Sequence, residues 1–421
     1  MFQRLRLKSY ASLSVLAGLF LLGGLPNPQQ EQTPLAATGA IQGPAGAGDA
    51  PVCPGAEVGA ARCHSRVLID SRGNPLATTS ATGYNPTQLR HAYGFDLLSG
   101  NGAGQTIAIV DAFDDPTIFN DLAVFKQQFG ITGCNLTKVN QNGGSTFPRV
   151  DSGWALEISL DVEWVCAIAP GANILLVEAT TTSFTNLLTA VDYGAQHAHV
   201  VSMSWGGSEF SSESSSNFHF NVNGVSFTAS SGDNGTGVIY PAAAPFVIAV
   251  GGTTLPLDSA GNLTGSETAW SGSGGGISAF EAEPGYQSSY SIPNTGAKRG
   301  VPDVSYNANP STGVSVYDTT RFQGQLGWFV IGGTSAGAPQ WAALIAIVNQ
   351  GRISPLSSNN LTSSPEYNAA TSAVYASNYR DITAGTNGTC GSVCTATTGY
   401  DFVTGLGSPR ANNLVPYLQT H

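Results

Sequence analysis

A serine at the start of a predicted helix constrains this chain more than any other feature. Residues 332–339 read Gly-Gly-Thr-Ser-Ala-Gly-Ala-Pro, and an apolar run from Gln340 to Gln350 follows directly. This order places the Ser335 hydroxyl at a helix N-terminus, where unpaired backbone N–H groups and the positive end of the helix dipole gather. An oxyanion that forms beside Ser335 would be stabilised there. The segment therefore predicts a nucleophile.

A serine nucleophile needs a neighbouring group to take its proton, and histidine is the usual base. No histidine has the glycine-flanked His-Gly-Thr-His context that subtilisin-type enzymes use. Asp111 ends a predicted strand where such an enzyme keeps its aspartate, but without the histidine motif we expect Asp111 to be structural or to line a cleft. We interpret all six histidines as surface or boundary residues: His64, His91, His197, His199, His219 and His421.

Carboxylates offer a second route to a base. Apolar residues recur every four positions within residues 151–170, which predicts a helix. Glu157 and Asp161 are four residues apart and therefore share one face of it. If this face is buried, the two carboxyls do better by sharing one proton, and the pKa of one rises. Such a carboxyl can deprotonate a serine in acid, where histidine is already charged. The alternative is a solvated acidic face.

Four short motifs, taken in order, resemble the sedolisins, which are serine-carboxyl peptidases with a subtilisin-like fold. The match runs from about Tyr84 to Pro409. The motifs are Glu157-x-x-x-Asp161, Ser202-Met-Ser-Trp205-Gly206-Gly207, Ser230-Ser231-Gly232-Asp233 and Gly333-Thr334-Ser335-Ala336.

The resemblance implies a role for each polar residue of these motifs. Ser335 is the nucleophile, and Glu157 is the general base and later the acid for the leaving amine. Asp161 orients Glu157 and shares its proton. Asp233, in its protonated form, donates into the oxyanion hole beside the Ser335 N–H. The edge at residues 205–207 accepts the peptide substrate by backbone pairing.

The implied function is hydrolysis of peptide bonds in proteins or peptides at acidic pH by an endopeptidase. Two alternatives stay open. One is a subtilisin-like Ser-His-Asp peptidase that uses Asp111 and an unrecognised histidine. The other is an inactive secreted binding protein on a peptidase fold, because a fold does not guarantee activity.

A second constellation lies near the C-terminus, in residues 380–383 and 397–409. Its aspartates and turn-forming glycines suit Ca²⁺, which takes six or more oxygen ligands, many of them backbone carbonyls. The resemblance implies one Ca²⁺, held by the carboxylates of Asp381 and Asp401 and by the carbonyls of Ile382 and Gly399. Thr397 stands where relatives often have a further glycine ligand.

The middle of the chain alternates strand and helix signals. This rhythm predicts an α/β fold with a mostly parallel central sheet flanked by helices on both faces, and the resemblance makes it subtilisin-like. We expect strands at 105–110, 173–178, 199–204 and 246–250, and helices at 118–129 and 184–196.

The charge balance argues against a nucleic-acid partner. Charged residues make up 10% of the chain, and the formal net charge is −11. A sparse, acidic charge set has no basic patch to neutralise phosphates. It also has few surface ion pairs to lose when carboxylates protonate in acid. With no coiled-coil pattern, we expect a monomer.

The N-terminus reads as an export signal. Basic residues precede an apolar run over 13–25 that is short for a membrane span. We expect residues 1–37 to be a signal peptide, and the mature protein to be secreted and to lack a stable membrane span. Residues 38–83 are expected to be a short low-order leader, trimmed before Tyr84. Residues 84–421 then form the peptidase domain; most sedolisins carry a long folded prosegment instead.

Six cysteines in an exported chain sit in an oxidising compartment, where disulfides form. The local pairs Cys53–Cys63 and Cys390–Cys394 are favoured, which leaves Cys134 with Cys166. Other connectivities stay open.

Overall fold

Eight strands form the central sheet of this protein, in the order β13-β12-β10-β8-β5-β7-β6 with β16 beside β12. Only β13 pairs antiparallel, so the sheet is mostly parallel, as predicted. The computed structural model describes residues 48–55 and 57–421, so the predicted signal peptide lies outside the described residues. The strands are β5 (Thr106–Ala112), β6 (Asn135–Asn140), β7 (Asn173–Ala179), β8 (Val200–Met203), β10 (Ser226–Ser230), β12 (Val247–Thr254), β13 (Thr268–Ala269) and β16 (Val304–Asn307).

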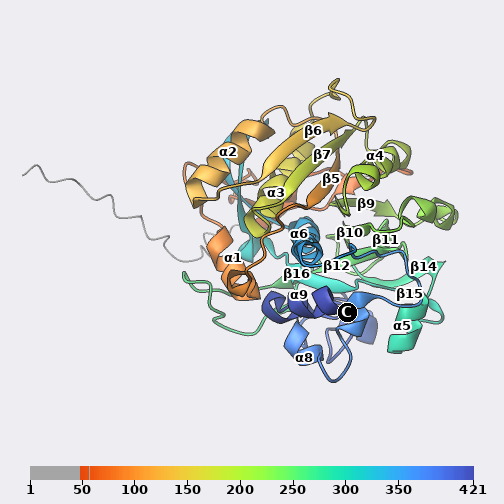
Figure 1. Ribbon diagram of the computed structural model, residues 1–421. Coiled ribbons are helices and arrows are strands. Elements are labelled where there is room, and N and C mark those ends of the chain that lie inside the picture. The colour runs from red at the N-terminus through yellow and green to blue at the C-terminus, as the bar shows by residue number, and fades with distance from the viewer. Residues whose placement is uncertain (1–47, 56) are drawn as a thin grey trace, which may run out of the picture. The chain divides into compact units, whose positions relative to one another are not determined.

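Helices cover both faces of this sheet. Val201 of β8 lies under Gly194 of α4 (Phe184–His197). Thr228 of β10, in register with Ser202, donates a hydrogen bond to the Ala338 carbonyl of α6 (Gly337–Gln350). Because successive strand residues point to opposite faces, α4 and α6 cover opposite faces. Figure 1 shows α6 beside β10 and β12, against which it packs.

Helix α3 (Ser152–Ile168) is buried on all sides. It begins at Asp151, whose side chain accepts hydrogen bonds from the Gly153 and Trp154 N–H groups at 3.2 and 3.3 Å. The helix packs between α6, α2 (Ile118–Phe129) and β17 (Val314–Phe322). A helix that is apolar on most sides belongs in a core. The face that carries Glu157 and Asp161 is therefore buried, and the solvated acidic face is ruled out.

The predicted elements agree with the observed ones to within a few residues. The expected strands correspond to β5, β7, β8 and β12, and the expected helices to α2 and α4. The other helices are α1 (Pro86–Tyr93), α5 (Gly285–Tyr290), α7 (Pro365–Asn368), α8 (Tyr375–Asn378), α9 (Ala411–Thr420) and the 3₁₀ turns η1 (Phe95–Leu97), η2 (Glu213–His219), η3 (Pro310–Thr312), η4 (Thr334–Ala336) and η5 (Gly391–Cys394). The smaller ladders are formed by β2 (Arg62–Cys63), β9 (Trp205–Ser208), β11 (Ile239–Tyr240), β14 (Gly276–Ala282), β15 (Lys298–Val301), β19 (Tyr379–Arg380) and β20 (Ser408–Pro409).

Residues 48–55 and 57–83 are ordered, which corrects the expectation of a low-order leader for the described part of residues 38–83. They supply β1 (Gly48–Pro51), β3 (Arg66–Ile69) and β4 (Ala77–Thr78) to a second sheet. In that sheet β3 and β4 pair antiparallel with β18 (Gln325–Gly332), the strand that leads to Ser335. These strands could not be predicted from the sequence, because they are two to four residues long and depend on pairing with β18 or, for β1, with β3.

All three disulfides join the predicted partners: Cys53–Cys63, Cys134–Cys166 and Cys390–Cys394. The second ties α3 to the turn before β6. Disulfides of this kind are typical of proteins in oxidising compartments.

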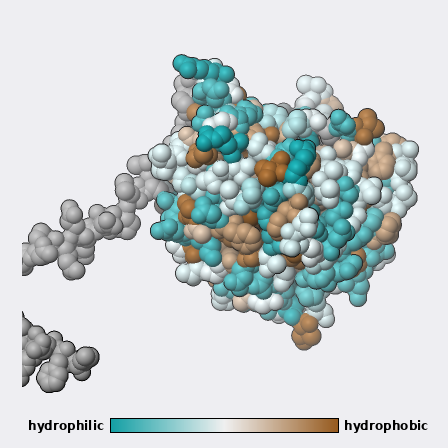
Figure 2. Space-filling view, turned by 90° about the horizontal axis from the view of Figure 1, so that it is seen from above, coloured by the Kyte–Doolittle hydropathy of each residue, from teal (hydrophilic) through white to brown (hydrophobic). Residues whose placement is uncertain are grey.

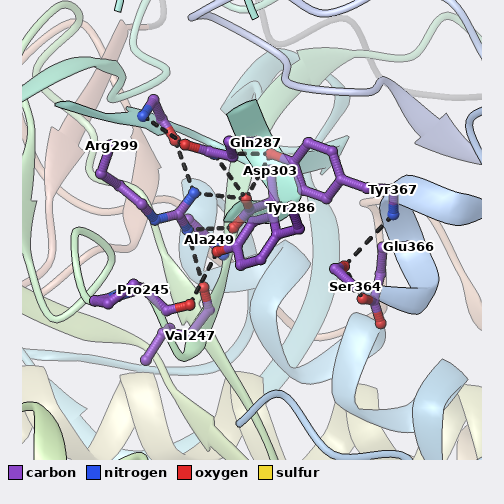
Figure 3. Close-up of polar contacts among 11 residues, drawn as sticks. Pro245, Val247, Ala249, Tyr286, Gln287, Arg299, Asp303, Ser364, Glu366 and Tyr367 are labelled. Atoms are coloured by element: carbon purple, nitrogen blue, oxygen red, sulfur yellow. Dashed lines mark hydrogen bonds and ion pairs between the residues drawn. The ribbon is translucent and has the colours of Figure 1, made fainter. Parts of the chain in front are cut away.

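A buried ion pair between Arg299 and Asp303 joins the central sheet to neighbouring elements. The Arg299 guanidinium is fully buried and donates to both oxygens of Asp303, at 2.7 and 2.6 Å. Figure 3 shows that Asp303 also accepts hydrogen bonds from the Tyr367 hydroxyl and the Ala249 N–H, each at 2.8 Å. The Asp303 carboxylate thereby links β12, β15 and α7.

The surface is largely polar on the face seen in Figure 2, where hydrophobic residues form small separate groups. Scattered apolar side chains of this kind are normal on a protein surface. Within residues 48–421, apart from position 56, no helix combines the length and hydropathy of a membrane span.

Replacement of Arg299 should destabilise the fold strongly. Arg299→Met leaves the Asp303 carboxylate buried without its cation, which costs about 3–5 kcal/mol of unfolding free energy. Equilibrium urea unfolding measures the loss. Arg321→Met, at an exposed arginine, is the control and should cost about 0.5 kcal/mol or less. Equal losses in the two variants would contradict the role of the pair.

Candidate active site

Ser335 lies in the turn η4, directly before α6, so its hydroxyl is at a helix N-terminus as the sequence predicted. The Ser335 hydroxyl donates to the Ser204 carbonyl at 3.2 Å, and the Ser335 N–H donates to the His64 carbonyl at 2.9 Å. Gly333 has a φ of 98°, and a Cβ there would lie 2.4 Å from both the Asp233 Oδ2 and the His64 carbonyl oxygen. Only glycine fits this turn.

Glu157 and Asp161 are fully buried beside Ser335. Burial raises the pKa of Glu157 well above its usual range, and the Asp161 carboxyl raises it further. The Ser335 and Ser65 hydroxyls temper this rise because they lie within reach of the Glu157 carboxyl. Within the described residues, no carboxyl oxygen of Glu157 or Asp161 makes a hydrogen bond of normal geometry. The Glu157 carboxyl thus lies within reach of the Ser335 hydroxyl, and the Asp161 carboxyl lies beside that of Glu157.

A third acid joins this pair. Asp111, at the end of β5, is fully buried. Burial raises the pKa of Asp111 first, and the Asp161 and Glu157 carboxyls raise it further. The sequence placed Asp111 at a strand end but could not bring it to α3, because the contact depends on how that helix lies on the sheet. Three carboxyls in one buried group cannot all ionise.

Asp233 follows β10 and faces the site from the other side. Its Oδ1 accepts the Thr334 N–H and the Thr334 hydroxyl, each at 2.8 Å. Its Oδ2 has no partner among the described residues and lies against Gly333, as the His64 carbonyl does. Burial raises the pKa of Asp233 to about 7. Below that pH, Asp233 is protonated and its carboxyl can donate a hydrogen bond.

His64 corrects the interpretation of all histidines as surface or boundary residues. Its side chain is buried, and the ring Nδ1 contacts the Ser230 hydroxyl at 2.9 Å. Burial, and then the nearby Arg62, lower the pKa of His64 to about 3. Ser335 contacts only the backbone of His64. The alternative of a Ser-His-Asp peptidase therefore gains no support from this ring.

Comparisons with known proteins agree with this geometry. Residues 152–385 match the subtilase family. Kumamolisin of Bacillus sp. (strain MN-32) is 34% identical over 403 residues, which are 85% of this chain and 68% of kumamolisin. The chain belongs to the sedolisin family.

Two further matches support this membership. Sedolisin of Pseudomonas sp. (strain 101) is 29% identical over 404 residues, 86% of this chain and 66% of sedolisin. The solved structure of Pseudomonas sedolisin, a serine-carboxyl proteinase complexed with two molecules of pseudo-iodotyrostatin, has a TM-score of 0.68 and 29% identity over 81% of this chain and 99% of its own. The chain spans about two thirds of the length of kumamolisin and of sedolisin. The subtilisin-like α/β fold predicted from the sequence is confirmed.

Three of the residues expected to bind calcium, Asp381, Gly399 and Asp401, lie close together in the C-terminal loops of this chain. The Gly399 N–H donates to both Asp381 oxygens, at 3.1 and 3.2 Å. The Tyr375 hydroxyl donates a hydrogen bond to Asp381 at 3.0 Å. Burial raises the pKa of Tyr375, the nearby Asp381 carboxyl raises it further, and the Asp401 carboxyl makes a smaller contribution. Both carboxyls therefore border one place in these loops, and such oxygen donors suit Ca²⁺.

A separate acidic cluster, which the sequence did not indicate, lies between α2 and β17. Oxygens of Asp115, Asp121 and Asp318 lie within 4.8 Å of one another, and all three residues are buried. Burial raises the pKa of Asp115 to about 6 and that of Asp318 to about 9. The three carboxyls are close enough to bind one cation, or to share protons at acidic pH.

We expect stability to fall as the pH rises. Asp318 has a higher pKa in the folded state than in the unfolded chain, so the folded state binds more protons above about pH 4. Its contribution is complete below that pH and is lost as the pH approaches 9. At about 1.4 kcal/mol per pKa unit, the loss amounts to a few kcal/mol. Urea unfolding at fixed calcium concentration, at acidic and neutral pH, measures it.

Asp318→Asn tests this assignment because an amide cannot titrate. The variant should show a shallower fall of unfolding free energy with pH than the parent. Glu57→Gln, at an exposed carboxyl with no ion-pair partner among the described residues, is the control and should retain the parent's slope. A parental slope in Asp318→Asn would contradict the assignment.

Proposed function

We propose that this protein hydrolyses peptide bonds in proteins at acidic pH, with Ser335, Glu157 and Asp161 as its catalytic triad. The observation that carries the proposal is the burial of two neighbouring carboxyls beside the hydroxyl of a serine at a helix N-terminus. No function other than peptidase has a comparable set of groups in its favour.

The reaction begins when the Ser335 oxygen attacks the carbonyl carbon of the substrate. Glu157 takes the hydroxyl proton as the bond forms, and Asp161 holds the proton that the two carboxyls already share. Glu157 then gives its proton to the leaving amine as the C–N bond breaks. A water molecule attacks the resulting ester with Glu157 again as base, and Ser335 regains its proton.

The oxyanion hole consists of the Ser335 N–H and the protonated Asp233. The position that the His64 carbonyl takes, 2.9 Å from the Ser335 nitrogen, is where a substrate carbonyl would lie. Asp233 can donate only while it is protonated, and burial raises its pKa to about 7. Activity should therefore decline as the pH rises through that value.

Calcium is proposed as a structural ion. The Asp381 and Asp401 carboxylates and the Ile382 and Gly399 carbonyls would hold one Ca²⁺, which would brace the C-terminal loops. Asp401 already organises its own loop, since it accepts hydrogen bonds from the Val403 and Thr404 N–H groups at 2.8 Å. The chemistry at Ser335 does not pass through this ion.

Export and a monomeric state complete the proposal. The predicted signal peptide and three disulfides are typical of a secreted protein. The expected substrates are protein or peptide chains. The sparse, acidic charge set favours no nucleic-acid partner.

Substitution of the triad tests the reaction. Ser335→Ala, Glu157→Gln and Asp161→Asn should each lower kcat/KM by about 10³-fold or more, because the three groups act as a unit. Hydrolysis of a denatured protein at about pH 4 measures the loss. Glu163→Gln alters another buried carboxyl of α3 and should keep most of the activity. Parental rates in Glu157→Gln would rule out its role as base.

Removal of calcium should destabilise the fold before it affects the chemistry. A chelator should lower the unfolding temperature by several degrees, because an ion that binds only the folded state stabilises it. Asp381→Ala should reproduce the shift and abolish any further response to chelator. Thermal melts followed by circular dichroism measure both. A melt that chelator leaves unchanged would contradict the calcium site.

A further inference from the structure

Residues 60–65 run through the candidate active site in the manner of a bound peptide. Strand β2 pairs antiparallel with β9, and Arg62 lies opposite Gly206 and Cys63 opposite Trp205. The Ala61 N–H donates to the Thr182 carbonyl at 2.8 Å. Backbone pairing along an exposed strand is a common way for a protein to hold an extended peptide.

The peptide bond between His64 and Ser65 lies at the reacting atoms. The His64 carbonyl accepts the Ser335 N–H at 2.9 Å, inside the proposed oxyanion hole. The His64 N–H lies 3.1 Å from the Ser335 hydroxyl oxygen and 3.1 Å from the Ser204 carbonyl. Glu157 is within reach of both the Ser335 and the Ser65 hydroxyls. Nucleophile, base and oxyanion donor thus converge on one bond of the chain itself.

A strand ladder and a disulfide hold the chain before this bond, in addition to its pairing with β9. β1 forms an antiparallel ladder with β3 that extends from Gly48 opposite Ile69 to Pro51 opposite Arg66. The Cys53–Cys63 disulfide then closes a ring whose last member directly precedes His64. The ladder joins the part before the bond to the part after it without passing through the bond.

We propose that the enzyme cuts its own chain between His64 and Ser65, and that the disulfide-closed segment 48–64 then stays in the cleft as a resident product inhibitor. This inference rests on the proposed function. It moves the cut from the expected position before Tyr84 to a bond that the site already contacts, and it leaves β3 and β4 within the mature fold.

The step uses only the hydrolytic chemistry of the site. The Ser335 oxygen bonds to the His64 carbonyl carbon and its proton passes to Glu157. The C–N bond to Ser65 breaks, and Glu157 protonates the new Ser65 amine. One water molecule then cleaves the ester, which leaves a carboxyl group on His64 and restores the Ser335 hydroxyl.

The disulfide determines how firmly the cut end is retained. Without the ring, residues 61–64 would lose their tie to β1 and could leave the cleft while β1 stayed paired. With the ring closed, the end cannot explore other conformations, so less entropy opposes its rebinding. Loss of a ring of this size should weaken retention by about tenfold to a hundredfold.

The cut itself is tested on the full chain. Intact-mass and N-terminal analysis of the folded product at about pH 4 should find a new N-terminus at Ser65, with the sequence Ser-Arg-Val-Leu. Ser335→Ala should stay uncut under the same conditions. A Ser335→Ala chain that is cut at the same bond would overturn the proposal, since another peptidase would then make the cut.

Retention is tested by comparing two pairs of cysteine variants. After gel filtration, the parent should retain the fragment that ends at His64 and should hydrolyse an added fluorogenic peptide slowly. Cys53→Ala/Cys63→Ala should release the fragment and hydrolyse the peptide at least about tenfold faster. Cys390→Ala/Cys394→Ala, which opens a distant disulfide, should behave as the parent does. Equal release in both double variants and the parent would refute retention by the ring.

A synthetic peptide of residues 48–64 covers the case in which the first double variant fails to fold. Added to parent enzyme that has been washed free of its fragment, the oxidised ring should inhibit at least about tenfold more strongly than the same peptide with both cysteines replaced by alanine. Equal inhibition by the two peptides would overturn the proposed role of the disulfide.

These outcomes separate the inference from the function on which it rests. If the parent or the Cys53→Ala/Cys63→Ala variant hydrolyses the added peptide but no chain is cut after His64, the inference is wrong and the peptidase remains. If neither folded protein hydrolyses any peptide or its own chain, the proposed function itself fails.

Discussion

The burial of Glu157 and Asp161 beside Ser335 is the constraint on which the rest of this structure depends. Both carboxyls belong to α3, a helix enclosed by the sheet, α6, α2 and β17. A carboxylate in such surroundings loses its hydration, so the protonated form is favoured unless a cation lies near. The described residues place no cation beside this pair. The chemistry of the site is therefore tied to the way in which the core packs around α3.

The same principle recurs away from the active site. Burial raises the pKa of Asp318 to about 9 and that of Glu213 to about 8. Burial likewise raises the pKa of Asp233, whose protonated carboxyl can then donate a hydrogen bond. The buried Arg299–Asp303 pair follows the opposite rule, because there a guanidinium neutralises the carboxylate. Some buried acids of this chain are thus accommodated by protonation, and others, such as Asp303 and Glu267, by pairing with a buried or half-buried arginine.

The sequence predicted what depends on local order and missed what depends on distant contacts. The Ser335 turn, the shared face of Glu157 and Asp161, and the main strands follow from spacing along the chain, and they are observed where expected. Asp111 needed knowledge of how α3 lies on β5. His64 looked like a boundary residue because its surroundings in sequence are polar, yet backbone pairing with β9 draws it into the cleft.

The short strands of segment 48–83 escaped prediction for a related reason. Their residues carry too few apolar positions to give a periodic signal, and the β18 partners of β3 and β4 lie more than two hundred residues away. Pairing with a strand that the rest of the chain has already fixed supplies the order that their own sequence lacks.

The glycines of β9 have a consequence for which chains this enzyme can accept. A Cβ at Gly207 would lie 2.6 Å from the Ala60 carbonyl, so the strand offers a bare backbone on which a passing chain can lie close. Such a backbone surface selects a chain by the hydrogen bonds that its backbone can make rather than by the shape of its side chains. The N–H groups of Ala61 and His64 both donate to the enzyme in the segment that lies there. A chain with proline at either place has no hydrogen to donate to the Thr182 or the Ser204 carbonyl, so the cleft disfavours that residue through the hydrogen bond that it cannot make.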